Sequence, residues 1–213
     1  MIKSVILARG NSKGIHKKNL IDLNGKPLIY YVITESLKSN TQETYVSTDN
    51  EEIKEISLKY GAKVIDRPKE LSLDTSSSEE ALLHFSENID FNILVFIQPT
   101  SPLIKYEYIN KGIEMVKNGG YDSVFSCLKQ HWIPEWSLDL KPLNFNLNDK
   151  YPRRQEKEEK LIDIGMFYVI KRETLLENKF RLGGKIGYVE LPLSESFQVD
   201  DMEDLKLIEK LMK

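Results

Sequence analysis

The sequence predicts an α/β fold, a three-layer sandwich built on a mostly parallel, Rossmann-like sheet that carries a small insertion. Two observations support this interpretation. Short apolar runs typical of buried strands alternate with amphipathic helical patterns, which favours parallel strands joined by right-handed helical crossovers. The chain of 213 residues is also long enough to bury one large core. We therefore interpret residues 1–213 as a single domain.

Strands are expected where apolar residues run continuously and stop at a turn signal. The first run opens into a glycine loop, and the most apolar run, at residues 93–97, should be central in the sheet. A Gln-Pro-Thr-Ser-Pro stretch stops that strand abruptly. In chain order, the expected strands are residues 4–8, 44–47, 63–65, 93–97, 123–127, 166–170 and 186–190.

Helices are expected between these strands, and capping signals mark where they begin. Pro27 suits the first position of a helix that runs to about residue 37. The stretch Ser-Thr-Asp-Asn at 47–50 predicts the next N-cap, and a Ser-x-x-Glu capping box at 76–79 or 77–80 predicts the third. Three further helices are expected. One carries Ile109, Ile113 and Val116, a short one follows the strand that ends at residue 170, and the last carries Leu205, Ile208 and Leu211.

Residues 128–162 break this alternation. The segment holds both tryptophans, Trp132 and Trp136, three prolines and a charged run at 153–160. An apolar projection on a domain of this size would expose a costly patch, so we expect it to pack against a second copy of the chain. A symmetric homodimer is the simplest outcome.

Composition excludes several classes of function. No apolar run approaches the roughly 18 residues of a membrane span. Lys and Arg total 30 against 33 Asp and Glu, and the resulting pI near 5.8 disfavours general binding of nucleic acid. Cys127 is the only cysteine, which rules out an intrachain disulfide. With no signal-peptide pattern at the N-terminus, we expect a cytoplasmic protein with no membrane or nucleic-acid partner.

The loop after the first expected strand concentrates positive charge. Arg9, Lys13, Lys17 and Lys18 occur there with no acid among them, interleaved with glycines. Ligands of open α/β sheets bind at the carboxyl ends of the strands. A polyphosphate needs such cations together with the backbone N–H groups that glycines leave accessible. The spacing fits neither the Walker A motif nor G-x-G-x-x-G, and a solvated basic loop is the alternative.

Several motifs together resemble those of the acylneuraminate cytidylyltransferases, the enzymes that make CMP-sialic acid. In the first half they are ILARGNSKGI at 6–15 followed by Lys18-Asn19, VSTD at 46–49, RP at 67–68, DTSSS at 74–78 and QPTSPL at 98–103. In the second half, the motifs most similar to animal-type members are GYDSVFS at 120–126, PRRQ at 152–155 and GGK at 183–185. The resemblance spans essentially the whole chain and implies a nucleotidyltransferase sheet.

The resemblance also implies a reaction. CTP would condense with a 2-keto-3-deoxy sugar acid and release pyrophosphate, assisted by Mg²⁺, with Mn²⁺ as an alternative ion. The anomeric hydroxyl would attack the α-phosphorus in line, so catalysis would depend on positioning and charge stabilisation rather than a covalent enzyme intermediate. N-acetylneuraminate is the first expected acceptor, and legionaminic, pseudaminic and Kdo-like acids stay open. Further alternatives are another base, a sugar phosphate acceptor, or a non-catalytic nucleotide-binding module.

By the same resemblance, the first loop holds most of the nucleotide. Lys18 is the best candidate to stabilise charge on the α-phosphate, with Arg9 and Arg154 as further catalytic residues. For Arg67, the alternative is a surface salt bridge with an acid such as Glu70. The expected nucleotide-binding residues are Ala8, Arg9, Gly10, Asn11, Ser12, Lys13, Lys18, Asn19, Arg67 and Ser78.

The implied acceptor site draws on the loop after the central strand and on the insertion. The amide of Gln98 can bond sugar hydroxyls, and arginine forks suit phosphate and carboxylate. A charged run on a loop is usually solvated surface, which is the alternative for 153–155. The expected acceptor-binding residues are Gln98, Thr100, Ser101, Arg153, Gln155 and Tyr168.

The metal site is where the chain departs from the family pattern. Relatives commonly have an Asp-x-Asp pair after the last strand, and aligning on the GGK motif places Gln198 and Asp200 there. We expect Asp200 to bind Mg²⁺, with Gln198 offering a neutral oxygen. Asp201 could compensate, or it could cap the final helix. A second departure, Asp163-Ile164-Gly165 where relatives commonly have Asn before the Gly, bears on sugar specificity.

Overall fold

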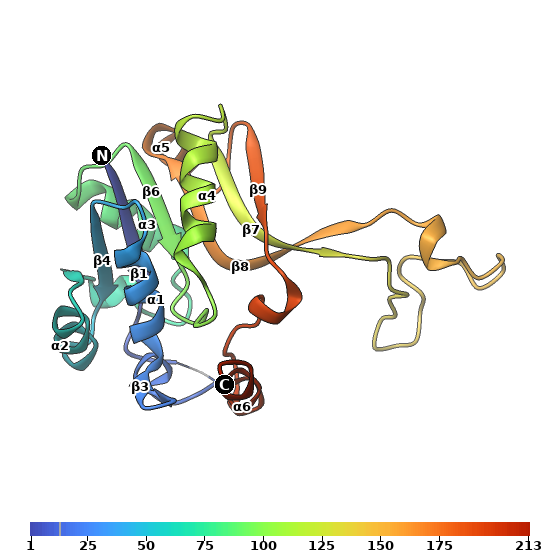
Figure 1. Cartoon of the computed structure of the whole chain (residues 1–213), viewed down its shortest axis with the longest axis horizontal. Coiled ribbons are helices and arrows are strands. Elements are labelled where there is room, and N and C mark those ends of the chain that lie inside the picture. The colour runs from blue at the N-terminus through green and yellow to red at the C-terminus, as the bar shows by residue number, and fades with distance from the viewer. Residues whose placement is uncertain (13) are drawn as a thin grey trace.

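The computed structural model describes residues 1–12 and 14–213, with the backbone alone at Arg154. Within these residues, seven strands form one sheet in the order β5-β4-β1-β6-β8-β7-β9 (Figure 1). A separate hairpin of β2 (Asp22–Leu23) and β3 (Lys26–Pro27) turns at Asn24 and Gly25, both with positive φ. The sheet strands are β1 (Ile2–Leu7), β4 (Glu43–Thr48), β5 (Lys63–Asp66), β6 (Ile93–Ile97), β7 (Ser123–Gln130), β8 (Lys160–Lys171) and β9 (Ile186–Glu190).

The sheet is mostly parallel, as predicted. Only β8 runs against its neighbours β6 and β7, while the pairs β5–β4, β4–β1, β1–β6 and β7–β9 are parallel. Parallel neighbours need a crossover connection, whereas consecutive antiparallel strands such as β7 and β8 do not. The central position predicted for residues 93–97 is also confirmed, because β6 is buried at every position and is fourth of seven in the sheet.

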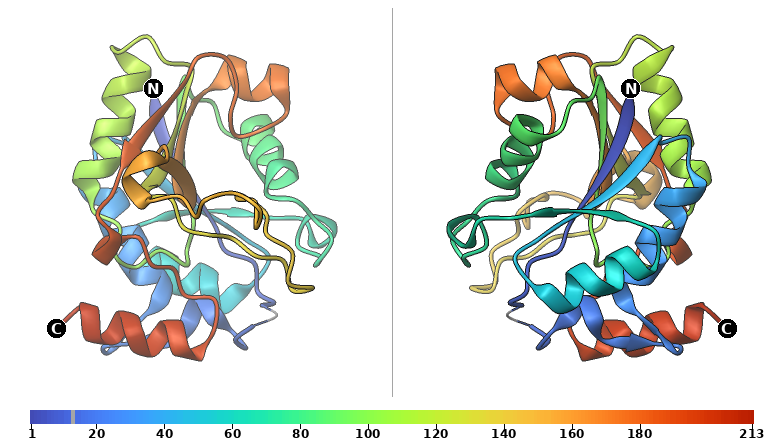
Figure 2. Two further views of the ribbon diagram at one scale, coloured as in Figure 1. Left: turned by 90° about the vertical axis from the view of Figure 1, so that its right-hand side faces the viewer. Right: turned by 90° about the vertical axis from the view of Figure 1, so that its left-hand side faces the viewer.

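Helices cover both faces of the sheet and complete the three-layer sandwich, as Figure 2 shows from two sides. One core lies under α1 (Leu28–Lys38), α2 (Glu51–Lys59) and α4 (Tyr106–Lys117), and the other under α3 (Ser78–Asn88) and α5 (Arg172–Asn178). The final helix, α6 (Met202–Leu211), packs through Leu205 and Ile208 on Leu23 and Leu28. Leu211 was expected on the same buried face but is exposed, because it ends the helix beyond this contact.

The predicted caps determine where three helices begin. The Asn50 side chain accepts from Ile53 N at 3.0 Å and caps α2. The capping box of α3 uses Ser77 and Glu80, the second of the two predicted spacings. At α6 the cap is Asp201, whose carboxylate accepts from the N–H groups of the first turn. The capping alternative for Asp201 is therefore confirmed.

The insertion forms an arm, residues 128–162, that leaves the sheet as a continuation of β7 and β8. Leu128 pairs with Ile162 and Gln130 with Lys160, so both strands are longer than the sequence predicted. Beyond them the arm is mostly irregular and projects away from the sandwich (Figure 1). Trp132 is buried within the arm against the ring of Phe145. None of the described helices combines the length and apolar character needed to cross a membrane.

The cap at α6 generates a stability prediction. Replacing Asp201 by Ala leaves two first-turn N–H groups without their acceptor, and we expect the free energy of unfolding to fall by about 1 kcal/mol. Asp201→Asn keeps a capping oxygen and should cost much less. Urea denaturation of both variants measures the difference, and equal losses for Ala and Asn would contradict the capping role.

Candidate active site

The candidate site lies where the strands β1, β4 and β6 end, at the edge of the sheet that the sequence indicated. Two cavities adjoin there, of about 250 and 320 Å³, and both are lined by Leu7 and Arg9. The smaller cavity, which we call the α3 cavity, also contacts Arg67, Gln98 and the serines that begin α3. The larger, which we call the Lys18 cavity, is lined further by Ser12, Gly14, Lys18, Asn19, Pro99, Thr100 and Asp200.

The loop after β1 is held against the end of β4. Ala8 is fully buried and donates its N–H to Ser47 O at 3.0 Å, which continues the strand pairing past Leu7. Gly10 donates its N–H to Asp49 Oδ1 at 2.8 Å, and a Cβ at Gly10 would lie 2.9 Å from that of Asn50. Only glycine allows this approach without a shift of the neighbouring side chain.

Two cations of this loop, Arg9 and Lys18, line the cavities and are each bonded to the protein, whereas Lys17 lines neither and pairs with Glu52. Arg9 donates to Leu73 O at 2.8 Å and pairs with Asp74 at 3.0 Å. Lys18, whose side chain is 15% exposed, donates to Val199 O at 3.0 Å and to Asp200 Oδ1 at 3.1 Å. These contacts fix the direction of both side chains toward the cavities.

The remaining predicted residues of the loop differ in their surroundings. Buried Asn19 donates to Arg9 O at 3.0 Å and so supports the loop as well as lining the Lys18 cavity. Ser12 lines the same cavity, whereas Asn11 is exposed and lines neither. Lys13 lies outside the described residues.

Arg67 is a buried cation rather than a surface one. It is 8% exposed, and its guanidinium donates to the hydroxyl and the carbonyl oxygen of Ser47. Burial lowers the pKa of Arg67 to about 10; Asp49 opposes this shift and Arg9 adds to it. Across the described chain no ion pair joins Arg67 to Glu70, so the surface salt bridge is not formed.

The α3 cavity combines the helix start with the end of the central strand. Ser78 is the first residue of α3 and lines the cavity with Ser76 and Ser77. N–H groups at a helix N-terminus favour anions and polar ligand oxygens. Gln98 lines the opposite side, and its N–H donates to Met166 O at 2.9 Å, which fixes the backbone from which its amide extends.

The loop after β6 brings Thr100 to the Lys18 cavity and buries Ser101. The Thr100 hydroxyl donates to Gln198 Oε1 at 3.0 Å, and the Gln198 amide nitrogen donates to Ile164 O. Ser101 is fully buried and lines neither cavity, and its hydroxyl finds no partner among the described residues. The structure therefore brings Thr100 and Gln198 together, whereas Ser101 is buried away from both cavities.

Tyr168, predicted to bind the acceptor, lies in the core and lines neither cavity. Its ring stacks on Phe96 with centroids 5.7 Å apart, and its hydroxyl donates to the exposed carboxylate of Asp163 at 3.0 Å. Burial, with the negative charge of Asp163, raises the pKa of Tyr168 to about 12. Arg181 covers the ring at 5.1 Å and bonds Glu79 at 2.6 Å.

Sequence reasoning missed two of these contributions. Asp49, predicted as part of a helix cap and of the VSTD motif but given no role in the site, accepts from the N–H of the loop residue Gly10. Its position directly after β4 was the available signal. The pair Arg181–Glu79 joins residues far apart in the sequence, and no local pattern indicates it.

Among the described residues that line the Lys18 cavity, Asp200 is the one acid, with 78% of its side chain exposed. Within residues 1–12 and 14–213, no group of three or more His, Cys, Asp and Glu side chains could hold a metal by itself. Mg²⁺ usually binds one or two protein carboxylates and completes its shell with water and substrate phosphates. A single carboxylate beside a cavity lined by Lys18 and Arg9 fits that mode of binding.

The arm residues predicted to act on the substrate lie away from both cavities of their own chain. Arg153 and Gln155 are exposed on the projecting arm, and Arg153 Nε pairs with Glu156 at 3.3 Å. The side chain of Arg154 lies outside the described residues. One chain alone therefore does not bring Arg153 and Gln155 to the Lys18 cavity (Figure 1).

The architecture is that of an α/β protein with a Rossmann-like sheet of the nucleotidyltransferase type. The fold is that of CMP:2-keto-3-deoxy-manno-octonic acid synthetase complexed with CTP, with a TM-score of 0.74, 21% identity and coverage of 99% of this chain and 98% of the other. It is also that of 4-diphosphocytidyl-2C-methyl-D-erythritol synthase from Anaerococcus prevotii, with a TM-score of 0.66, 14% identity and coverage of 99% and 97%.

The chain belongs to the cytidylyltransferase family, whose model matches residues 4–211. It is 38% identical to N-acylneuraminate cytidylyltransferase A of Danio rerio over 93% of this chain and 48% of the relative, so it spans about half the length of that protein. It is 31% identical to pseudaminic acid cytidylyltransferase of Campylobacter jejuni over 98% of this chain and 95% of the relative. The predicted resemblance, including that to animal members, is confirmed.

Burial of Arg67 generates a prediction. Arg67→Lys keeps the charge but cannot donate to Ser47 from two guanidinium nitrogens, so we expect the free energy of unfolding to fall by about 1–2 kcal/mol and the affinity for CTP to weaken. Urea denaturation and titration calorimetry with CTP measure the two effects. Lys69→Ala, an exposed neighbour, is the control; if it behaves like Arg67→Lys, burial of Arg67 does not explain the loss.

Proposed function

We propose that this protein transfers CMP from CTP to a sialic-acid-like 2-keto-3-deoxy sugar acid and releases pyrophosphate. The observation that carries the proposal is the Lys18 cavity at the strand ends, where Arg9, Lys18 and Asp200 meet in a chain of the cytidylyltransferase family. Backbone N–H groups of a glycine loop and two cations suit the triphosphate. The adjoining α3 cavity offers Gln98 and serine hydroxyls to the remaining parts of the substrates.

The reaction needs positioning and charge stabilisation. The oxygen of the anomeric hydroxyl forms a bond to the α-phosphorus, the bond to the β-phosphate oxygen breaks, and the hydroxyl proton leaves to solvent or a base. Lys18 donates to the α-phosphate oxygens as negative charge develops on them, and Arg9 holds the departing pyrophosphate. Cys127 is no rival nucleophile, because burial raises the pKa of its thiol to about 11.

Asp200 is the proposed ligand for Mg²⁺, or Mn²⁺ in its place. When bound, the ion would neutralise phosphate charge and polarise the reacting phosphoryl group. The Lys18 ammonium at 3.1 Å keeps the Asp200 carboxylate oriented toward the cavity. We also propose a cytoplasmic location, which the single cysteine and hence the lack of an intrachain disulfide supports.

The acceptor class is supported by relatives whose names differ in the sugar. Some are N-acylneuraminate cytidylyltransferases and another is a pseudaminic acid cytidylyltransferase. The decisive experiment offers CTP with N-acetylneuraminate, legionaminic, pseudaminic and Kdo acids and records pyrophosphate release, with UTP, GTP and ATP as controls. Turnover with none of these acids, alongside tight CTP binding, would refute the enzymatic proposal and favour a nucleotide-binding module.

The arm supports a homodimer in which each arm reaches the site of the partner. Outside its buried Trp132, the arm exposes large apolar side chains: Trp136, Leu138, Leu140, Leu143, Leu147 and Tyr151. Apolar surface of this kind marks an interaction site, and an isologous contact of two copies would cover both arms at once. In this arrangement Arg153, Arg154 and Gln155 would serve the partner's acceptor and phosphate groups.

Lys18 generates a catalytic prediction. Lys18→Ala should lower kcat about 100-fold, because the ammonium acts on charge that develops in the transition state. The free energy of unfolding should change by only about 1 kcal/mol. Lys17→Ala is the matched control, since Lys17 is exposed and pairs with Glu52 on α2. Steady-state kinetics decide, and a kcat near wild type for Lys18→Ala would remove it from the mechanism.

The shared site generates a prediction about mixtures. Lys18→Ala and Arg153→Ala should each be impaired alone. When equal amounts are refolded together, half of the dimers contain one chain of each variant, and each such dimer has one site with an intact Lys18 and an intact Arg153. The mixture should therefore regain about a quarter of wild-type activity. Light scattering should give twice the chain mass of 24.7 kDa. Impaired variants that fail to complement, or a monomer at micromolar concentration, would contradict the shared site.

A further inference from the structure

Gln198 joins three separate segments through one side chain. It lies between the short helix η4 (Leu193–Glu195) and α6, its carbonyl oxygen accepts from Thr100 Oγ1 at 3.0 Å, and its amide nitrogen donates to Ile164 O. Thr100 follows the central strand β6, and Ile164 belongs to β8. Both ends of the amide are therefore engaged by the protein.

The backbone around this amide is built to receive it. Val199 donates its N–H to Thr100 O at 2.8 Å, so the two segments meet at adjacent positions. Gly165 has a φ of +67°, and a Cβ there would lie 3.3 Å from the Gln198 amide nitrogen. A larger residue at position 165 would strain the backbone and press on the amide.

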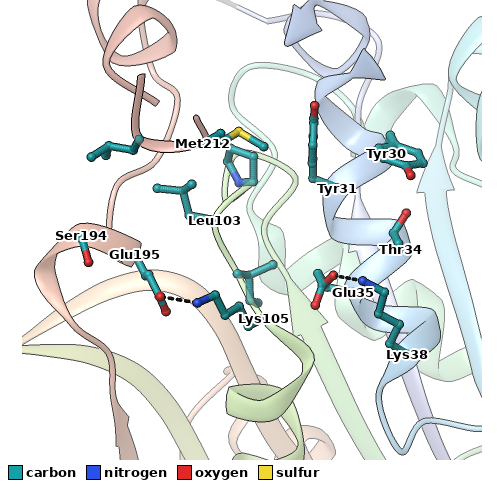
Figure 3. Close-up of a pocket in the computed structure, with 13 residues that line it drawn as sticks. Tyr30, Tyr31, Thr34, Glu35, Lys38, Leu103, Lys105, Ser194, Glu195 and Met212 are labelled. Carbon is teal, nitrogen blue, oxygen red and sulfur yellow. Dashed lines mark hydrogen bonds and ion pairs between the residues drawn. The ribbon is translucent and has the colours of Figure 1, made fainter. Parts of the chain in front are cut away.

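A second set of contacts joins the segment before Gln198 to the chain that follows Thr100. Glu195 of η4 pairs with Lys105 and accepts from Tyr108 Oη at 2.7 Å. Figure 3 shows the Lys105–Glu195 contact at the wall of a cavity of about 510 Å³ next to α1, which contains none of the predicted site residues. The loop that carries Gln198 is thus held by Glu195 before it and by the Asp201 cap after it. The amide bridge is one of its contacts with the site, beside those that Val199 and Asp200 make with Lys18.

We propose that Gln198 is a positioning residue that locks the Thr100 loop to Ile164 of β8 on the acceptor side of the site, and that metal binding depends on Asp200 and not on Gln198. The chemistry of the bridge requires an amide, since it supplies one acceptor to Thr100 and one donor to Ile164 O. An ionised carboxylate would supply acceptors only and would face the Ile164 carbonyl without a proton to donate. This inference deepens the proposed function and rests on it for the acceptor alone.

A second consequence concerns charge. The triphosphate and the acceptor carboxylate are both anionic, and an amide at position 198 adds no negative charge beside them. At position 198, therefore, an amide that supports Thr100 without charge takes the place of a carboxylate that could bind the metal. Such support must be satisfied at every polar atom, because a half-satisfied bridge costs more than it contributes.

The first test is a double-mutant cycle in the ligand-free protein. Thr100→Val and Gln198→Met each remove part of the bridge while nearly conserving volume, and each should lower the melting temperature by about 2–6 °C. The double variant should lose clearly less than the sum, because both changes remove the same bond. Lys105→Met, which breaks the exposed ion pair between the same segments, is the control and should add independently to Gln198→Met. Additive losses for Thr100→Val and Gln198→Met would overturn the proposal.

The second test separates positioning from metal binding. In a calorimetric titration of the protein–CTP complex with Mn²⁺, Gln198→Met should stay within about twofold of wild type, whereas Asp200→Asn should weaken binding about tenfold or more. With the accepted sugar acid, Gln198→Met should raise the acceptor KM about threefold to tenfold. A tenfold loss of Mn²⁺ affinity in Gln198→Met would make it a metal ligand and overturn the proposal. If no sugar acid is turned over, the proposed function fails, while the cycle and the Mn²⁺ titration still decide the role of Gln198.

Discussion

Positive charge held at the carboxyl end of β1 is the constraint around which this site is arranged. Arg67 is buried beside Arg9, and burial together with that neighbour lowers its pKa, so the fold keeps two cations close where water cannot screen them fully. Asp49 and the oxygens of Ser47 offset part of the cost. The triphosphate that we propose would relieve the rest. The loop after β1 places its cations there, and Gly10 allows its close approach to Asp49 and Asn50.

The side of the site that we propose for the acceptor is held by side-chain hydrogen bonds instead. Thr100, Gln198 and Ile164 of β8 form one hydrogen-bonded unit, and Tyr168 donates to Asp163 from the core. The cationic half and the hydrogen-bonded half lie at the same end of the sheet but depend on different interactions. Charge attracts and orients phosphate, while fixed donors and acceptors select the shape and hydroxyl pattern of a sugar acid. The departures from the family pattern at 163–165 and 198 both fall in this second half, which we propose to be the side of the acceptor.

The arm follows from the one reversal in the sheet. Because β7 and β8 are consecutive and antiparallel, their pairing can continue beyond the sandwich without a crossover helix, and the exposed ends carry the connecting residues outward. The arginines on this arm are thereby separated from the cavities of their own chain, while the apolar side chains around them remain exposed. A second copy would resolve both features at once.

The sequence by itself determined the order of strands and helices along the chain, the central position of β6 and the loop that lines the Lys18 cavity. For the caps of α3 and α6 it offered alternatives that included Ser77 and Asp201, and the structure selected these two. These are local properties, fixed by apolar runs, capping residues and charge within a few positions. Only the tertiary structure decided that Arg67 is buried on Ser47, that Ser101 is hidden, that Leu211 is exposed, and that the Gln198 amide spans Thr100 and Ile164. Each of these depends on which residues, distant along the chain, meet at a strand end, and a hydrogen bond between such residues leaves no periodic or spacing signal in the sequence.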